Sequence, residues 1–246
     1  YSDVGNYTFD TYLDYVQQGI YLWENSPYVK NYPELYFLNY VLFHRTNDEE
    51  IKPCRTYFWK KIKDKVQGKA MVEAALEINH WCAGEVMYQG TDMRTGSALE
   101  IYRSGVGRCG EEAVFVVNVM RSAGIPARPV YVPRWSHCDD NHAWVEVWCD
   151  GDWHYLGACE PEAVLDKGWF TNAASRAMMI GSRWYDRAMP DEKVIGKDGM
   201  NRIINLLGKY AKTRWITITV EDLDGTPAAG AKVRAEVMNY GEFSPI

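Results

Sequence analysis

Helical spacing of apolar residues dominates the first third of the chain. Four stretches show it, with hydrophobic side chains every three or four positions: 10–25, 33–44, 57–66 and 71–88. In the first stretch Val16 and Ile20 fall on the apolar stripe, and in the second Leu35 and Leu38 do. Ser26-Pro27 interrupts the first helix. The N-terminal region is therefore predicted to be mostly α-helical.

The hydrophobic period changes to two in the middle of the chain. Three short segments are predicted to be strands: 128–132, 142–148 and 153–159. In the second segment His142 and Trp144 lie on one face and Val145 on the other. Asp150-Gly151 is a hairpin signal between the second and third strands. A helix with apolar positions from Ala113 onward precedes all three, which predicts an α+β fold with this helix packed on an antiparallel sheet.

The last third mixes loop, helix and strand patterns. Helices are predicted over 173–179 and 201–210, and alternation predicts strands over 215–220 and 231–237. The two strands resemble the opening hairpin of a β-sandwich-like module, which is too short to bury its own core. We therefore expect the native protein to continue beyond Ile246. The predicted domains are a helical region, a core and the start of that module: 1–70, 71–212 and 213–246.

Composition excludes several functions. The 246 residues carry a net charge of −6 and no basic block, which argues against nucleic acid as a partner. No run of 18 apolar residues is present, so no membrane span is predicted. The six cysteines show no metal-ligand spacing, and neither a metal nor a cofactor is expected. A dense disulfide framework is not implied for a chain of this length.

The candidate chemistry centres on Cys109. This cysteine begins the predicted helix directly after the glycine-spaced turn Gly105-Val106-Gly107. A thiol at a helix N-terminus meets unpaired backbone N–H groups and the positive end of the helix dipole, both of which favour the thiolate. The same N–H groups can stabilise an oxyanion after the thiolate attacks a carbonyl. Cys109 is therefore a candidate nucleophile.

His142 is the candidate base for this nucleophile. It opens a predicted strand 33 residues after Cys109 and could take and return the thiol proton. The simpler alternative is that Cys109 is a small buried residue and His142 a structural one. The combination of helix start, glycines and strand-borne histidine favours the catalytic interpretation.

These residues also carry a family resemblance. The run GVGRCGEEAVFVVNVMRSAGIPARPVYV, then NHAWVEVW, then a strand that begins with Trp, resembles the transglutaminase-like superfamily of papain-type folds. The similarity extends from about Asn79 to Glu160 and implies that Cys109 is the nucleophile and His142 the base. Members include transglutaminases, peptide N-glycanases and bacterial cysteine peptidases.

The third catalytic position departs from the family pattern. The segment WHYLGACE (153–160) resembles the Trp-x-x-x-Asp-Ala-Cys-Glu stretch of peptide N-glycanases, but Gly157 stands where the Asp that orients the histidine is expected. Pairing of Trp148 with Trp153 across the hairpin would place Gly157 opposite Trp144, on the same face as His142. Glu160 is the nearest carboxylate. Strict alternation points it away from His142, and a bulge or strand end could redirect it. The loop residues Asp139, Asp140 and Asn141 remain alternatives.

Three residues are candidates for substrate binding. Trp144 could line the cleft, Trp81 could assist the oxyanion as a Trp does in some relatives, and Gly107 could let a substrate backbone approach. Packing is the competing interpretation for both tryptophans. No calcium-loop pattern is present.

The predicted function is acyl transfer at an amide carbonyl through a thioester, most simply hydrolysis by a transglutaminase-like cysteine peptidase or amidase with Cys109, His142 and Glu160 as catalytic residues. The expected partner is a peptide, protein or glycopeptide substrate. The C-terminal β pattern favours an extracytoplasmic location: secreted, periplasmic or attached to a surface. The alternative is a domain whose triad has decayed at Gly157 and which binds peptides or glycans.

Overall fold

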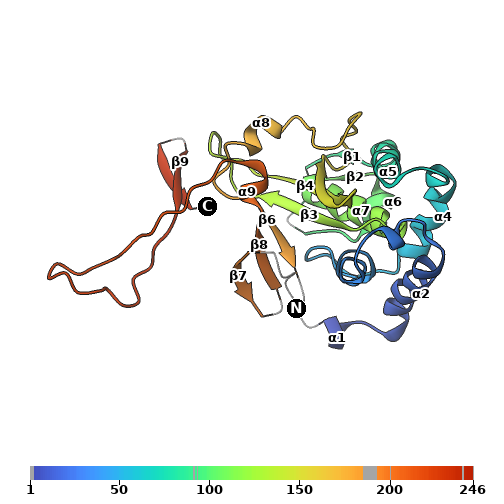
Figure 1. The fold of residues 1–246 in the computed structure, drawn as a ribbon, viewed down its shortest axis with the longest axis horizontal. Coiled ribbons are helices and arrows are strands. Elements are labelled where there is room, and N and C mark those ends of the chain that lie inside the picture. Colours follow the sequence, from blue (N-terminus) through green and yellow to red (C-terminus); the bar gives the residue numbers. More distant parts are fainter. Residues whose placement is uncertain are drawn as a thin grey trace.

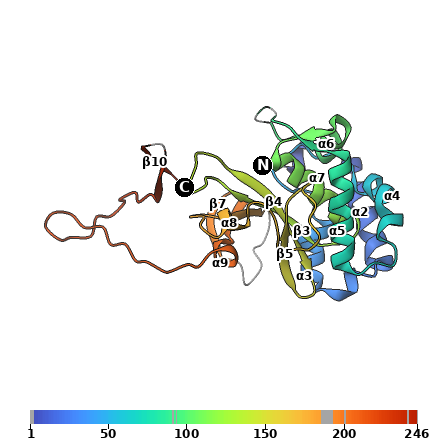
Figure 2. The same cartoon turned by 90° about the horizontal axis from the view of Figure 1, so that it is seen from above.

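A computed structural model describes residues 3–90, 92, 94–184, 193–199, 201–239 and 241–245. Helices from the first half of the chain lie on one side of a sheet built mainly from the second half (Figure 1). The same two layers are visible from above, where α5 and α7 lie beside β3 and β4 (Figure 2). The fold is therefore α+β, as the sequence predicts.

The helical layer follows the predicted stretches closely. Its elements are α1 (Asp3–Asn6), α2 (Phe9–Asn25), α3 (Glu34–Phe37), α4 (Arg55–Val66), α5 (Met71–Glu85), α6 (Ala98–Ser104) and α7 (Cys109–Ser122), with a 3-10 turn at Val29–Asn31 and a π-helical turn at Leu38–Leu42. Ser26 ends α2 in an extended conformation, because a proline follows it. The predicted helix over 33–44 is thus divided into an α and a π turn.

Helix α7 is the centre of the fold. Every residue from Glu111 to Ser122 is buried, because α7 contacts α4, α5 and α6 on one side and β3 (Ala127–Val132) and β4 (His142–Cys149) on the other. Gly124, in a left-handed conformation at φ 83°, ends it. An enclosed helix of this kind has no solvent-exposed face. Cys109 is therefore attached to a helix that other elements enclose.

The main sheet has six antiparallel strands in the order β5-β4-β3-β6-β8-β7. Its remaining strands are β5 (Asp152–Leu156), β6 (Gly181–Trp184), β7 (Val194–Asp198) and β8 (Asn201–Asn205), while the short β1 (Met87–Tyr88) and β2 (Val106–Gly107) pair in parallel elsewhere. Val145 and Val147 pack toward the helices and Trp144 packs in a second apolar cluster. The predicted alternation along β4 is confirmed.

The β4–β5 hairpin sets the register near the site. Asp150 (φ 53°) and Gly151 (φ 95°) make the tight turn, and Trp148 pairs with Trp153 as predicted. The strand ends at Leu156, three residues earlier than expected. Gly157 pairs with Glu160 instead of continuing along β4. The expected pairing of Gly157 with Trp144 is therefore wrong.

The buried faces of α2 and of the helical segment 33–44 differ from prediction. In α2 the buried residues include Tyr15 and Leu22, whereas Val16 and Ile20 are exposed. Leu35 and Leu38 are also exposed, and Phe37 faces the core instead. With many aromatic and aliphatic side chains on every face, spacing alone did not single out the buried stripe.

The C-terminal third was the least well predicted. Thr171–Ala174 forms the short α8, and the expected helix over 201–210 is strand β8 followed by the single turn α9 (Leu207–Tyr210). Residues 215–220 lie in no strand, and the second predicted strand appears only as β9 (Glu236–Asn239), which pairs with β10 (Glu242–Pro245). The segment extends away from the body (Figure 1). The domain division at 212/213 stays a prediction.

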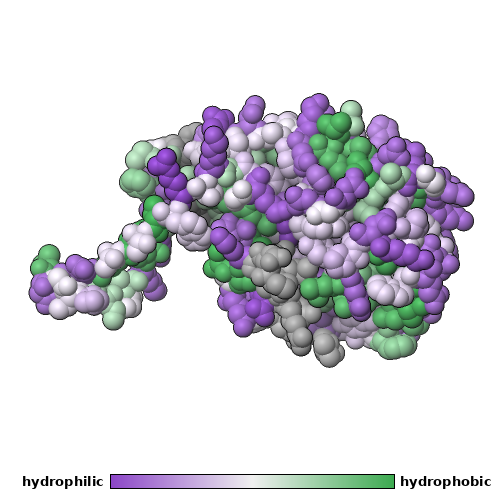
Figure 3. Space-filling model, in the orientation of Figure 1, coloured by the Kyte–Doolittle hydropathy of each residue, from purple (hydrophilic) through white to green (hydrophobic). Residues whose placement is uncertain are grey.

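The surface is mainly hydrophilic on the face turned to the viewer in Figure 3, with separate hydrophobic patches over the body. On the extended C-terminal segment Trp215 and Ile216 are largely exposed, and Lys193 Nζ lies 4.4 Å from the Trp215 ring centroid. Within the described residues, no helix has the length and apolar character needed to cross a bilayer.

Candidate active site

Cys109 lies at the first position of α7. Arg108 precedes it in an extended conformation, and the Glu111 side chain accepts a hydrogen bond from the Arg108 backbone N–H at 3.2 Å. The helix start is thereby fixed. The thiol is only partly buried, and the backbone N–H groups of Gly110 and Ala143 are close enough to lower its pKa against the effect of burial. Because Ala143 follows His142, the start of β4 reaches the nucleophile.

His142 is held among aromatic rings. It pairs with Val132 across the sheet, and its ring centroid lies 4.7 Å from that of Trp169 and 5.0 Å from that of Phe170. Its Nε2 is buried and has no hydrogen-bond partner among the described residues. Trp169 and Phe170 were missed by the sequence reasoning, because their loop follows no period.

A cavity of about 230 Å³ brings the two candidates together. Cys109, Gly110, His142 and Ala143 line it together with residues 129–133, at the end of β3. Its volume matches about eight water molecules, at roughly 30 Å³ each in the liquid. A small acyl group can therefore occupy the space beside the thiol.

Burial keeps both groups neutral at rest. It raises the pKa of the Cys109 thiol above its usual value, and the two backbone N–H donors and Arg108 oppose this effect only in part. Burial lowers the pKa of His142 to about 4, against a smaller opposite effect of Asp140. Sequence reasoning expected a lowered thiol pKa from the helix terminus, but desolvation outweighs that effect. The site is a thiol facing a neutral imidazole.

A tight turn redirects Glu160 toward Gly157. Cys159 adopts a left-handed conformation (φ 57°), and buried Asn79 of α5 bonds both the Gly157 carbonyl at 2.9 Å and the Cys159 N–H at 3.0 Å. A Cβ at position 157 would lie 2.2 Å from Glu160 Oε2. The Glu160 carboxyl therefore occupies the space that an Asp side chain at 157 would enter.

Trp169 connects Glu160 with His142. Its indole N–H donates to Glu160 Oε1 at 3.0 Å, while its ring contacts His142. Glu160 Oε2 is buried and, like His142 Nε2, lacks a partner in the described part of the chain. Burial raises the pKa of Glu160, and the Trp169 hydrogen bond opposes the rise. Trp169 therefore contacts two residues that each have a buried polar atom without a partner: His142, a possible donor, and Glu160, a possible acceptor.

A second acid, Glu112, is buried in the first turn of α7. Burial, with Glu160 and Glu111 nearby, raises its pKa to about 8. The neighbourhood of Glu112 with Glu160 depends on the Gly157–Glu160 turn, which no local pattern revealed.

The other acids near His142 are engaged elsewhere. Glu146 is too distant along the strand, and it forms a buried ion pair with Arg128 at 2.7 Å. Asp139 pairs with Arg134, and Asp140 Oδ1 accepts from the Asn141 N–H. None of the three loop residues has a hydrogen bond to the His142 ring in the described structure.

The substrate-binding candidates lie apart from the cavity. Trp144 is fully buried, and its N–H donates to the Tyr210 hydroxyl at 2.9 Å. Trp81 stacks on Tyr102 in the helical layer. A Cβ on Gly107 would lie 3.1 Å from the Glu111 side chain, so its missing side chain allows close packing on α7. The geometry favours packing for all three residues.

Metal ligation finds no support in the described residues. No group of three or more His, Cys, Asp or Glu side chains there could hold an ion. All six cysteines are free thiols.

Comparison with known proteins gives one family match. The sequence model of the transglutaminase-like superfamily matches residues 60–158, a range that contains Cys109 and His142 and ends two residues before Glu160. No curated protein matches the chain.

Solved structures give distant similarities. A candidate cysteine protease from Cytophaga hutchinsonii is 18% identical with a TM-score of 0.36, over 61% of this chain and 57% of that one. LapG of Legionella pneumophila is 17% identical with a TM-score of 0.37, over 45% and 66%. Red sea bream transglutaminase is 16% identical with a TM-score of 0.32, over 59% and 26%. This chain therefore spans less than two thirds of each of these proteins.

The matched range contains the central helix, the first strands of the sheet, and both the thiol and the imidazole of the cavity. Residues 60–158 of this chain are therefore similar to the transglutaminase-like superfamily.

Proposed function

We propose that this protein is a cysteine hydrolase that cleaves an amide bond of a peptide or glycopeptide through a thioester on Cys109. The observation that carries the proposal is the shared cavity, in which the thiol at the start of α7 meets the first residues of β4. Nucleophile, base and backbone N–H donors then stand on two rigid elements, which is the arrangement that acyl transfer requires.

The first step is attack of Cys109 Sγ on the amide carbonyl. His142, neutral because of its low pKa, accepts the thiol proton as the C–S bond forms. The N–H groups of Gly110 and Ala143 are the nearest donors for the resulting oxyanion. The tetrahedral intermediate then expels the amine, which receives the proton from His142. Water, deprotonated by His142, hydrolyses the thioester and regenerates the thiol.

Glu160 is the proposed orienting acid. A proton on Nε2 of His142 leaves Nδ1 as the base, and Glu160 Oε2 is a buried acceptor without a partner beside the same tryptophan. The two atoms are not hydrogen-bonded in the resting structure, so we expect the bond to form as the imidazole becomes charged. An orienting acid fixes the tautomer and stabilises that charge.

Acetylation by 4-nitrophenyl acetate tests the nucleophile without knowledge of the substrate. We expect a burst of nitrophenolate and an acetyl group on Cys109, found by peptide mass spectrometry, followed by slow turnover. His142→Ala should slow acetylation by about 100-fold, within the range for general base catalysis. Half-buried Cys138 is the internal control. Acetylation of Cys109 no faster than that of Cys138 would overturn the hydrolase proposal.

Exchanging the acid tests Glu160. Glu160→Gln should reduce turnover, and Gly157→Asp alone should do so too, because its side chain collides with the Glu160 carboxyl. Gly157→Asp combined with Glu160→Ala should recover activity relative to either single variant. If Glu160→Gln turns over like the wild type, Glu160 does not orient His142.

A binding module is the second candidate. The missing hydrogen bond between His142 and an acid in the described structure favours it. A binding module predicts no acetylation burst. For an active enzyme, adding an amine to the assay separates hydrolysis from transamidation, and we expect water to remain the main acceptor.

A further inference from the structure

Asn47 places a side-chain amide in the wall of the cavity that holds Cys109. It lies in the loop between the π-helical turn and α4, outside residues 60–158, and it lines the cavity together with Cys109 and His142. Its side chain is half-buried. Neither the sequence patterns nor the family match pointed to this residue. Its hydrogen bonds decide which end of the amide can meet a ligand.

Arg183 fixes the orientation of the Asn47 amide. Its Nη1 donates to Asn47 Oδ1 at 3.0 Å. A guanidinium only donates hydrogen bonds, so the amide atom that receives this one is the oxygen and not the nitrogen. Asp48 Oδ2, 4.0 Å from the same guanidinium nitrogen, helps to hold the arginine in place. The engaged arginine therefore leaves Nδ2 as the end of the amide that can bind a ligand.

Asn47 Nδ2 has no hydrogen-bond partner among the described residues. The other hydrogen bonds of Asn47 use its backbone, since its carbonyl accepts from Arg45 at 3.2 Å and its N–H donates to Glu49 Oε2 at 2.6 Å. An amide nitrogen carries two N–H donors and does not act as an acceptor. Nδ2 of Asn47 can therefore donate to a group in the cavity.

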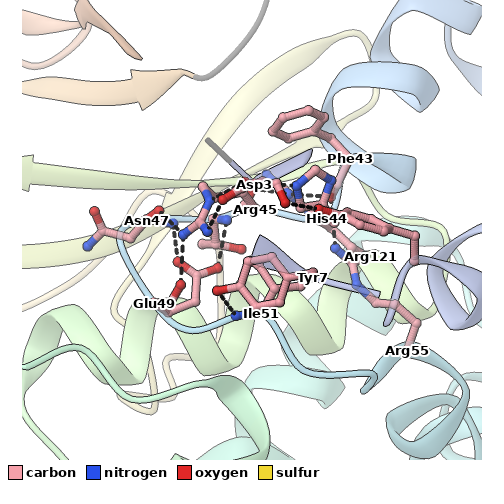
Figure 4. A network of polar contacts seen from close by, with 12 residues as sticks. Asp3, Tyr7, Phe43, His44, Arg45, Asn47, Glu49, Ile51, Arg55 and Arg121 are labelled. Atoms are coloured by element: carbon pink, nitrogen blue, oxygen red, sulfur yellow. Dashed lines mark hydrogen bonds and ion pairs between the residues drawn. The ribbon is translucent and has the colours of Figure 1, made fainter. Parts of the chain in front are cut away.

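The loop that carries Asn47 is anchored to the helix that carries Cys109. Arg121 of α7 donates to the Arg45 carbonyl at 3.0 Å. Arg45 donates to the Glu49 carbonyl, and the Glu49 carboxyl accepts the Asn47 N–H (Figure 4). In the same view the Asn47 side chain points away from this network. The donor is thus held in place before a ligand arrives, so little entropy is lost in ordering it.

Three other polar side chains of the cavity wall are less suited to bind a neutral group. Asn141 is exposed, and no hydrogen bond in the described structure holds its side-chain amide. Arg108 donates to the backbone carbonyl of Asp92, and Arg183 is directed to its own loop partners. The backbone N–H groups near the thiol are assigned to the oxyanion. The loop amide is then the oriented donor available for a second carbonyl of the substrate.

We propose that Asn47 Nδ2 donates a hydrogen bond to a backbone carbonyl of the substrate, one residue from the amide that Cys109 attacks and on its acyl side. The cavity of about 230 Å³ has room for a small acyl residue beside the thiol, so a carbonyl at that distance meets the cavity wall. The substrate class is a peptide cut at a backbone amide, after a residue that is itself acylated on its nitrogen. This assignment rests on the proposed acyl-transfer function, but the hydrogen bond can be measured without turnover.

Two chloromethyl ketones measure this hydrogen bond. Each alkylates a thiol: the C–S bond forms, chloride leaves, and the thiol proton passes to His142 or to solvent. N-acetylglycine chloromethyl ketone carries a second carbonyl, whereas 1-chloro-5-methylhexan-2-one has a similar shape with CH₂ and CH–CH₃ in place of the N–H and that carbonyl. The ratio of their rate constants at Cys109 should exceed the ratio at Cys138 by about five-fold, the effect of one neutral hydrogen bond. Peptide mass spectrometry of quenched samples gives both rates.

Two substitutions of Asn47 isolate its N–H donors. Asn47→Leu removes the amide, whereas Asn47→Asp keeps an oxygen for Arg183 and removes both N–H groups. Both variants should lower the ratio at Cys109 to the ratio at Cys138. Exposed Asn172→Asp is the matched control and should leave the ratio unchanged. Near-UV circular dichroism verifies that each variant keeps the native packing.

The outcomes separate the two proposals. Equal ratios at Cys109 and Cys138 in the wild type, or a wild-type ratio in Asn47→Asp, would overturn the role of Asn47 and leave the hydrolase intact if the acetylation burst is present. An equal loss in Asn141→Leu would also overturn it, because the effect would not be specific to the oriented amide. A ratio that depends on Asn47, in a protein that shows no acetylation burst, would support the carbonyl site and contradict the hydrolase.

Discussion

Glu112 should cost this protein stability at neutral pH. It lies in the first turn of α7 with 3% of its surface exposed, and burial beside Glu160 and Glu111 raises its pKa from 4.5 to about 8. The folded state therefore holds a proton that the unfolded chain releases above pH 4.5. Stability from this group is complete below pH 4.5 and is lost as the pH rises toward 8.

The size of the loss follows from the two pKa values. At 1.36 kcal/mol per pKa unit, Glu112 lowers the free energy of unfolding by about 3 kcal/mol at pH 7 and by about 5 kcal/mol above pH 9. At pH 5 the reduction is under about 1 kcal/mol. Glu112→Gln has a similar shape and no charge to lose. We expect the variant to exceed the wild type in free energy of unfolding by these amounts.

Urea unfolding followed by tryptophan fluorescence at pH 5, 7 and 9 measures the difference. Glu24→Gln, on the exposed face of α2, is the matched control and should follow the wild type at each pH. A stability gain in Glu112→Gln that is equal at pH 5 and pH 9, or no gain at pH 9, would refute the buried, protonated state of Glu112.

Three further predictions concern the site and its supports. Because the pKa of His142 is about 4, acetylation of Cys109 should lose half its rate near pH 4; a half-point near 6.5 would contradict the burial of the imidazole. Trp169→Phe keeps a ring on His142 but removes the N–H bond to Glu160, so turnover should fall about ten-fold with the melting temperature little changed. Wild-type turnover in Trp169→Phe together with a loss in Trp169→Ala would show that only the ring matters. Asp3→Asn removes the carboxylate that forms an ion pair with buried Arg45 and should lower the free energy of unfolding by about 2 kcal/mol in urea titrations, and no change would show that this ion pair is dispensable.

Local chemistry singled out the candidate nucleophile and the candidate base. A glycine-spaced turn before Cys109, an apolar helix after it and a strand that opens at His142 are all short-range patterns. The hairpin at Asp150-Gly151 is equally local, because a left-handed pair of residues favours one turn type. These features survive in the structure because neighbouring residues alone determine them.

The other features of the candidate site depend on contacts between segments that are far apart in the sequence. Asn79 of α5 pins the turn that carries Glu160, 81 positions away along the chain, and only that turn brings the carboxyl over Gly157. The contact of Trp169 with His142 and the placement of Arg183 beside the cavity also join remote segments. No periodic pattern in the sequence encodes contacts between segments so far apart.

The sequence by itself determined the α+β class, the helix start at Cys109 and the strand start at His142, because hydrophobic period and turn residues act over a few positions. Only the tertiary structure decided the protonation states of Cys109 and His142 and the position of Glu160, the candidate third residue. Burial raises the pKa of Cys109 and lowers that of His142, and burial depends on what the rest of the chain places around them. The strand end at Leu156, which frees Glu160 to turn back, is likewise fixed by packing against α5.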